Sequence, residues 1–188
     1  MRPIDLTVRR AWNGGKLLFL VGPGGVGKSA LGRSLAPKLG RTLVDLDETF
    51  LVRIGDIGGF IRDQGYAAYK AANVKLASVL ADEATRPLVL VMSPGFLIGD
   101  NPPETLAGNF ALLARGYSVS LLPSSDIEST VATIVSRQMT RPFNVGIAKE
   151  EAKARARFET YKAAGDILVC SIASPDAMAE ALMPHLLD

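Results

Sequence analysis

The sequence is poor in the residues that build redox and metal centres. Its 188 residues include one cysteine, Cys170, and one histidine, His185. A lone cysteine excludes an internal disulfide and a cysteine-based zinc site, and a lone histidine excludes a histidine-rich metal centre. The chemistry of this chain therefore depends on lysine, arginine, aspartate, hydroxyl groups and the backbone.

Long apolar runs and a strong charge of one sign are missing as well. The longest apolar runs, residues 17–21 and 88–92, are far shorter than the ~20 residues that a membrane-spanning helix needs. The 21 basic and 19 acidic side chains leave a formal net charge of +2, which is not typical of a protein that binds nucleic acid. We therefore expect a cytoplasmic monomer that binds neither membranes nor nucleic acid.

Short apolar runs recur along the chain with amphipathic stretches between them. These runs do not alternate with polar residues, which is typical of strands covered by helices on both faces. The pattern predicts a three-layer α/β fold, with a five-stranded parallel sheet, in one domain over residues 1–188. The predicted strands are residues 17–21, 42–45, 88–92, 118–122 and 167–171.

Three segments do not fit this simple alternation. Residues 1–15 are expected to form an N-terminal arm. Residues 46–86 hold about two helical segments, more than a minimal crossover needs, and we interpret them as a substrate-binding insertion. Residues 140–150 contain Pro142 and Gly146 between two helical segments, and we interpret them as a lid.

The segment GPGGVGKS, residues 22–29, predicts a phosphate-binding loop. It follows the first predicted strand and opens a helix, and it matches the pattern of Gly, four residues, Gly, Lys and Ser or Thr. Glycines let successive backbone N–H groups point at phosphate oxygens, while Lys28 would reach the β- and γ-phosphates and Ser29 would bind Mg²⁺. The alternative is a glycine-rich turn with a solvated lysine. The predicted ATP-binding residues of this loop are Gly22, Gly24, Gly25, Val26, Gly27, Lys28, Ser29 and Ala30.

Two carboxylates, Asp45 and Asp47, end the second predicted strand. Alternate residues of a strand point to the same side, so both side chains can face one cleft. Parallel sheets bind ligands at the carboxyl ends of their strands, where this pair lies. One carboxylate can hold Mg²⁺ while the other accepts the proton of a substrate hydroxyl. The alternative is a pair of solvated turn residues.

The phosphate loop and the D-L-D motif, together with Arg141-Pro142 and with Arg157 and Tyr161 in RFETY, resemble the shikimate kinase family. The resemblance extends from about residue 17 to residue 187. It implies an ATP- and Mg²⁺-dependent transfer of the γ-phosphoryl group to a hydroxyl of shikimate or a related hydroxylated carboxylic acid.

The same resemblance implies individual roles. Asp45 would belong with Ser29 to the Mg²⁺ site, and Asp47 would bind the substrate hydroxyls. Arg141 would cover the phosphates and Arg157 would grip the substrate carboxylate. Arg137 would stack on the adenine. The implied catalytic residues are Lys28, Asp47 and Arg141, and the implied substrate-binding residues are Asp47, Lys70, Ser93, Pro94, Gly95 and Arg157.

The acceptor side departs from the family pattern. Tyr69, Lys70 and Asn73 stand where the family has Phe, Arg and a following Glu, and the usual Gly-Glu before them is Gly65-Tyr66. The family's triple glycine is Ser93-Pro94-Gly95 in this chain. Lysine keeps the charge of arginine without its bidentate fork, and proline removes a backbone N–H. Phosphoryl transfer is therefore better supported than shikimate as the acceptor.

Other interpretations remain open at this point. The altered acceptor side is compatible with a kinase-like module that senses a metabolite with little turnover, or with a kinase for gluconate or another sugar acid. A regulatory GTPase has no visible N-K-x-D signature for guanine. Lys70 and Asn73 could line a solvated helix face, and Arg157 could belong to an exposed helix with pairs such as Glu151 and Arg155.

The charge is distributed unevenly along the chain. Residues 1–41 hold 8 basic residues and 1 acidic residue, and residues 137–162 hold 7 basic and 3 acidic residues. These two basic segments contain the phosphate loop and part of the predicted lid. We interpret the distribution as fitting a small polyanion such as ATP held between them.

Overall fold

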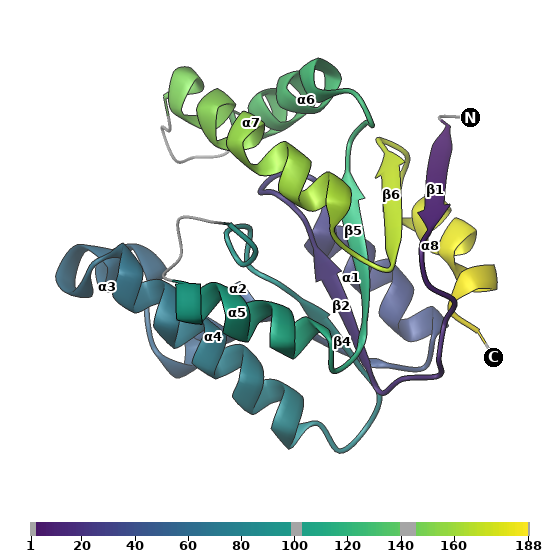
Figure 1. The fold of residues 1–188 in the computed structure, drawn as a ribbon, viewed down its shortest axis with the longest axis horizontal. Coiled ribbons are helices and arrows are strands. Elements are labelled where there is room, and N and C mark those ends of the chain that lie inside the picture. Colours follow the sequence, from purple (N-terminus) through teal and green to yellow (C-terminus); the bar gives the residue numbers. More distant parts are fainter. Residues whose placement is uncertain (1–2, 99–102, 140–145, 188) are drawn as a thin grey trace.

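The computed structural model describes residues 3–98, 103–139 and 146–187. Its centre is a sheet with the strand order β1-β6-β5-β2-β4-β3 (Figure 1). Strands β2 to β6 are parallel, which confirms the predicted α/β fold, but β1 adds a sixth, antiparallel strand beside β6. The strands are β1 (Ile4–Val8), β2 (Leu17–Val21), β3 (Thr42–Asp45), β4 (Leu88–Val91), β5 (Tyr117–Leu122) and β6 (Ile167–Ser171).

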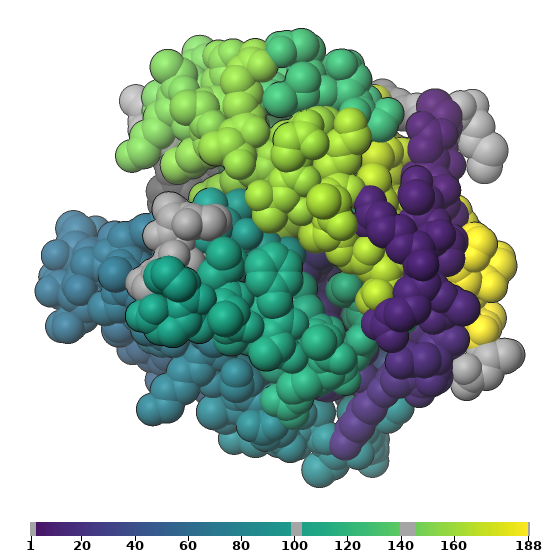
Figure 2. Space-filling view, in the orientation of Figure 1, coloured from purple at the N-terminus to yellow at the C-terminus, as the bar shows by residue number. Residues whose placement is uncertain are grey.

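The sixth strand lies in the segment that was expected to be an arm, so the prediction of five strands was wrong by one. β1 reads I-D-L-T-V, and its Ile4 and Leu6 pack against the core while Asp5 is exposed. A strand with only one covered face alternates apolar and polar residues, whereas the prediction searched for unbroken apolar runs. Figures 1 and 2 show β1 along one edge of the molecule.

The helices alternate with the strands, and residues 46–86 form three helices rather than two. Gly55 and Gly65 have φ angles of 136° and 87°, which an L side chain rarely adopts, and they separate the three. Among the described residues, no helix has both the length and the apolar character needed to cross a membrane. The helices are α1 (Lys28–Lys38), α2 (Leu46–Arg53), α3 (Ile57–Gln64), α4 (Tyr66–Glu83), α5 (Pro103–Leu113), α6 (Ile127–Met139), α7 (Ile147–Ala163) and α8 (Pro175–Leu182), followed by a 3₁₀ turn, Met183–His185.

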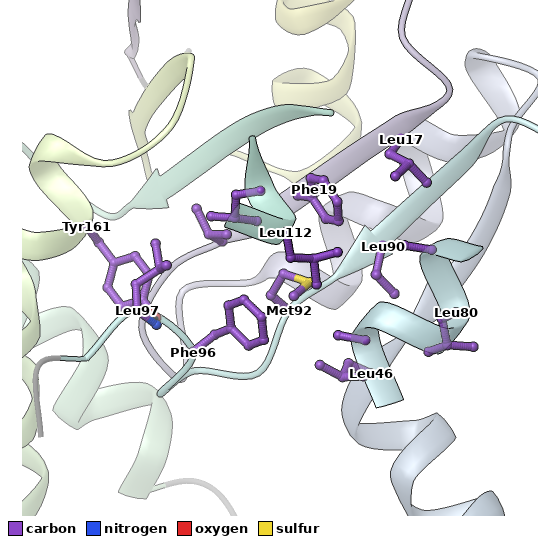
Figure 3. Close-up of a cluster of buried hydrophobic side chains, with 14 of the residues drawn as sticks. Leu17, Phe19, Leu46, Leu80, Leu90, Met92, Phe96, Leu97, Leu112 and Tyr161 are labelled. Atoms are coloured by element: carbon purple, nitrogen blue, oxygen red, sulfur yellow. The ribbon is translucent and has the colours of Figure 1, made fainter. Parts of the chain in front are cut away.

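Both faces of the sheet are covered, which explains the unbroken apolar runs. Side chains of β2 alternate between two buried clusters, with Phe19 in one and Leu18 in the other. Phe19 shares its cluster with residues of α4, α5 and α7, including Leu80, Leu112 and Tyr161 (Figure 3). Leu18 shares its cluster with residues of α1 and α8. The sheet is thus the middle layer of three, and its carboxyl edge carries the loops described below.

Arginines attach the N-terminal segment to the body of the protein. Arg10 Nε and Nη2 donate to the two carboxylate oxygens of Asp166, at 2.6 and 2.9 Å, and Ser118 donates to the same carboxylate from its backbone N and its hydroxyl. Arg9 donates to the carbonyls of Ala164 and Gly165. Two of the eight basic residues in 1–41, Arg9 and Arg10, therefore attach the N-terminal segment, whereas Lys28 and Arg33 of the same range line the cleft described below.

This attachment can be tested through Asp166. Burial acts to raise the pKa of Asp166, but the hydrogen bonds from Arg10 and Ser118 outweigh it, so the pKa lies below its usual range. A lowered carboxyl pKa stabilises the fold above the unfolded pKa of about 4, and this contribution is lost as the pH falls through the folded pKa. We expect Asp166→Ala to lower the free energy of unfolding at pH 7 by about 2–3 kcal/mol in urea titrations.

The loss should shrink as the pH falls below about 4, because the unfolded chain then binds a proton at Asp166 that the folded protein takes up only at a lower pH. Asp5→Ala, which removes an exposed carboxylate from β1, should change stability little at either pH. If Asp166→Ala lowered the free energy of unfolding equally at pH 7 and below pH 4, Asp166 would not act through its charge.

Candidate active site

The phosphate loop has the backbone that its glycines predict. β2 ends at Val21, and the chain turns through Gly22, Gly25 and Gly27, whose φ angles are 149°, 79° and 102°. A Cβ at Gly22 would lie 2.6 Å from the carbonyl oxygen of Leu121, so this position also needs glycine for space. Gly27 is the N-cap of α1, and a helix N-terminus after such a turn is suited to bind anions.

Lys28 is held inside this loop. It is 7% exposed, and its Nζ donates to the carbonyls of Gly22 and Pro23 at 2.8 and 2.9 Å. The alternative of a solvated lysine is therefore wrong. Beside it lies a cleft of about 270 Å³, which we call the phosphate cleft. Its lining residues are Gly24, Gly25, Gly27, Lys28, Ser29, Ala30, Arg33, Asp45, Asp47, Val91, Met92 and Pro94.

Two of the eight ATP-binding residues predicted in the loop do not line the cleft. Val26 is 1% exposed and packs into the core beneath the loop. Gly22 lies at the end of β2, where its carbonyl accepts from Lys28. Both residues therefore support the conformation of the loop from its core side and do not face the cleft.

The predicted metal ligands lie side by side. Ser29 Oγ donates to Asp45 Oδ2 at 2.6 Å. The other carboxylate oxygen of Asp45 accepts from the backbone N of Asp47 and of Glu48 and so caps α2. A hydroxyl and a carboxylate oxygen facing a phosphate site are the hard ligands that Mg²⁺ prefers, with phosphates and water completing its shell. These residues fit a magnesium ion.

Asp47 stands between the phosphate cleft and a polar network. Ser93 Oγ donates to Asp47 Oδ1, and Asn73 Nδ2 donates to Ser93 Oγ at 2.9 Å. Burial raises the pKa of Asp47, opposed by the hydrogen bond from Ser93 and by the positive charge of Lys28. The interpretation of Asp45 and Asp47 as solvated turn residues is therefore wrong. Asp45 accepts hydrogen bonds from Ser29 and from the backbone of α2, and Asp47 accepts one from Ser93.

Lys70 and Asn73 are 7% and 3% exposed, so they do not line a solvated helix face. Lys70 Nζ lies 4.6 Å from the centre of the Tyr66 ring, which is a cation–π contact. Both residues line a small cavity, which we call the Lys70 cavity. Its lining residues are Tyr66, Tyr69, Lys70, Asn73, Val74, Ser93, Gly95, Phe96 and Asn109.

The Lys70 cavity measures about 20 Å³, which is room for little more than one water molecule. The segment Ser93-Pro94-Gly95 borders both spaces, because Pro94 lines the phosphate cleft while Ser93 and Gly95 line the cavity. A Cβ at Gly95 would lie 3.1 Å from the hydroxyl of Tyr66, so this glycine allows a close approach. A small organic acid would need the cavity to widen.

Arg157 lies on the inner side of α7. It is partly buried, and its Nη2 would be 3.8 Å from a Cβ at Gly95. Within the described residues it makes no hydrogen bond or ion pair, whereas Arg155 pairs with Glu128 and Glu151 on the exposed side. The exposed-helix interpretation therefore holds for Arg155 and not for Arg157.

Tyr161 positions the segment that borders both spaces. The side chain is fully buried, and its hydroxyl donates to the carbonyl of Pro94 at 2.9 Å. Burial raises the pKa of this hydroxyl, so it stays protonated and remains a donor. Arg157 and Tyr161, one turn apart on α7, thus place a charged group near Gly95 and a hydrogen-bond donor on the carbonyl of Pro94.

The end of α6 covers the phosphate loop. Arg137 Nη1 donates to the carbonyls of Gly25 and Val26, at 3.2 Å each. A Cβ at Gly24 would lie 2.8 Å from Gln138 Nε2, which places this amide over the loop. The predicted catalytic Arg141 and most of the predicted lid lie outside the described residues.

Three residues near these spaces were missed from the sequence. Arg33 lines the phosphate cleft and pairs with Glu48 at 2.5 Å; its spacing of four from Ser29 on α1 could have indicated it. Asn109 is a polar residue at a buried position of α5, in register with Leu112 and Leu113. Gln138 carried no signal of its own.

The structure places a phosphate loop between β2 and α1, one carboxylate (Asp45) at the end of the parallel strand β3, and a second (Asp47) in the first turn of α2 rather than on the strand. This arrangement defines the fold and site of a P-loop kinase. The family model for shikimate kinase matches residues 24–186. The chain belongs to the shikimate kinase family.

Individual relatives agree with this. The shikimate kinase of Gloeobacter violaceus is 30% identical over 172 residues, which cover 88% of this chain and 89% of that protein. The pentafunctional AROM polypeptide of Scheffersomyces stipitis is 28% identical over 144 residues, and these cover 76% of this chain but only 9% of the polypeptide. The shikimate kinase of Acinetobacter baumannii, solved in complex with shikimate, superposes with a TM-score of 0.70 at 24% identity, covering 89% of this chain and 90% of that one.

The buried carboxylate of Asp47 gives a prediction for stability. A carboxyl pKa that is raised by folding stabilises the protein below the unfolded pKa, and this contribution is lost as the pH rises through the folded pKa. Asp47→Asn removes the charge and keeps an oxygen that can accept from Ser93. We therefore expect Asp47→Asn to raise Tm at pH 7, by about 2–4 °C for each kcal/mol gained.

Differential scanning fluorimetry at pH 7 and pH 4 would measure this. The gain should disappear near pH 4, where the wild-type carboxyl also binds a proton. The matched control is Asp63→Asn, an exposed aspartate of α3, for which we expect no gain. A lower Tm for Asp47→Asn at pH 7 would contradict the assignment.

Proposed function

We propose that this protein transfers the γ-phosphoryl group of ATP to a hydroxyl of shikimate or a closely related hydroxylated carboxylic acid. Membership of the shikimate kinase family implies an ATP-dependent phosphotransferase that acts on an alcohol group. The observation that carries the finer proposal is the position of Asp47. Its carboxylate lines the phosphate cleft and is hydrogen-bonded to Ser93, which lines the Lys70 cavity.

On the nucleotide side, the phosphate loop and Lys28 would bind the phosphates. Arg137, already bound to the loop, is proposed to stack on the adenine, and Arg141 is proposed to close over the phosphates. Mg²⁺, held by Ser29 and Asp45, would neutralise charge on the β- and γ-phosphates when bound. The work of the chain is then to position the nucleotide and exclude water.

On the acceptor side, Asp47 would orient the attacking hydroxyl and accept its proton. Burial supports this role, because a carboxylate with a raised pKa is a better base than a solvated one. Lys70 lines the cavity and Arg157 lies beside Gly95, so two cations border the space next to Asp47. This arrangement suits an acceptor that carries a carboxylate.

The first prediction of this proposal concerns the acceptor. Purified protein with ATP and Mg²⁺ should consume ATP when shikimate is added, in a coupled ADP assay against shikimate, quinate and gluconate. Lys28→Ala should lower kcat with the best acid by about 10²-fold or more, because it removes the cation held against the loop. Lys75→Ala, an exposed lysine of α4, should leave the rate unchanged.

Full activity in Lys28→Ala would contradict the mechanism. Tight binding of an acid without ATP turnover would instead support a metabolite-sensing role. If the protein phosphorylated gluconate but not shikimate, its acceptors would be sugar acids.

The second prediction concerns Arg157. Replacing it with alanine should raise the KM for the acid by about 10–100-fold, the size of a charge-assisted hydrogen bond, while the KM for ATP changes less than twofold. Arg157→Lys should recover part of the affinity. Arg155→Ala removes the neighbouring exposed arginine and serves as the control. Steady-state kinetics with each substrate varied in turn would distinguish these effects, and an equal rise in both KM values would exclude a specific role in acid binding.

A further inference from the structure

Among the described residues, a side-chain carbonyl oxygen of Asn109, which lines the Lys70 cavity, is buried without a hydrogen-bond partner. Asn109 is 1% exposed, and its Nδ2 donates to the backbone carbonyl of Phe96. That bond fixes the orientation of the amide. The described residues offer no donor to its Oδ1. An amide oxygen that is buried without a partner costs free energy, so such atoms in folded proteins usually have a partner supplied by water or a ligand.

Asn109 shares its cavity with several other polar side chains. Asn109 lines the Lys70 cavity together with the polar side chains of Lys70, Asn73 and Ser93. Asn73 and Ser93 are already hydrogen-bonded to each other. Helix α5 therefore contributes a hydrogen-bond acceptor to this cavity. Of the other polar side chains, Lys70 is a donor, and Asn73 and Ser93 are hydrogen-bonded to each other.

We propose that Asn109 is a specificity-determining residue, whose Oδ1 accepts a hydrogen bond from a hydroxyl of the bound acid. This assignment rests on the proposed function. The hydroxyl in question is not the one that is phosphorylated, because Asp47 lines the phosphate cleft and Asn109 lines the cavity on the other side of Ser93. An amide oxygen can accept only, so it selects an acid with an O–H or N–H group at this place and discriminates against the deoxy analogue.

The test compares acids that differ by one hydroxyl. Starting from the acid found active above, with shikimate first, the deoxy analogues that keep the phosphorylated hydroxyl are assayed with wild type and with Asn109→Leu. For wild type, we expect one analogue to lose at least about tenfold in kcat/KM relative to the parent acid. In Asn109→Leu that ratio should fall below about threefold, while the KM for ATP stays the same. Phe110→Ala, at a 48% exposed neighbour on α5, should keep the wild-type ratio.

The ratio separates recognition from a structural role. If Asn109 only supported Phe96, the variant would lose activity with parent and analogue alike and the ratio would not change, which would overturn the assignment while the kinase activity stands. If wild type phosphorylates no acid, the proposed function itself fails and the assignment falls with it.

A second measurement needs no variant and covers the case in which Asn109→Leu does not fold. In a crystal structure of wild type with ADP and the active acid, a ligand oxygen or nitrogen within about 3.2 Å of Asn109 Oδ1 supports the assignment. A water molecule as the sole partner of that oxygen, or no partner at all, overturns it.

Discussion

The carboxylate of Asp45 joins the two halves of the site. One of its oxygens accepts from Ser29 at the start of α1, and the other caps α2 through the backbone N of Asp47. The position of Asp47 is therefore set by the same group that is tied to the phosphate loop. A carboxylate is suited to this because it has two oxygens that accept in different directions. The Asp45 side chain thus links the position of the proposed base directly to the phosphate loop.

The second link runs through the segment Ser93-Pro94-Gly95. Ser93 binds Asp47, and the carbonyl of Pro94 accepts from the buried Tyr161 of α7. Arg157 lies one helical turn before Tyr161 and reaches the neighbourhood of Gly95. Helix α7, whose first turn falls within the predicted lid, is therefore anchored to the loop after β4. A movement of α7 would displace both Arg157 and the segment that separates the phosphate cleft from the Lys70 cavity.

The parallel core and the phosphate loop could be predicted from the sequence because their signals are local. Unbroken apolar runs mark strands such as β2, and the glycines of the loop are required by its own backbone. β1 escaped prediction because an edge strand has a different pattern, and the role of Arg10 depends on Asp166, which lies 156 residues later. The proposed role of Asn109 could not be predicted either, because only the fold shows that this polar residue of α5 lines the same cavity as Lys70.

The departures from the family pattern at the acceptor side occur in contacting pairs. Tyr66 and Lys70, which stand where the family has Glu and Arg, meet in a cation–π contact. Asn73 and Ser93, which stand where the family has Glu and Gly, are joined by a hydrogen bond. A serine placed alone in a buried position would have a hydroxyl without a partner, which is costly, whereas here Asn73 donates to it and Asp47 accepts from it. Substitutions that satisfy one another in this way maintain a packed polar site next to Asp47. The polar groups of both pairs therefore have partners, and this supports the hydroxy-acid acceptor proposed above.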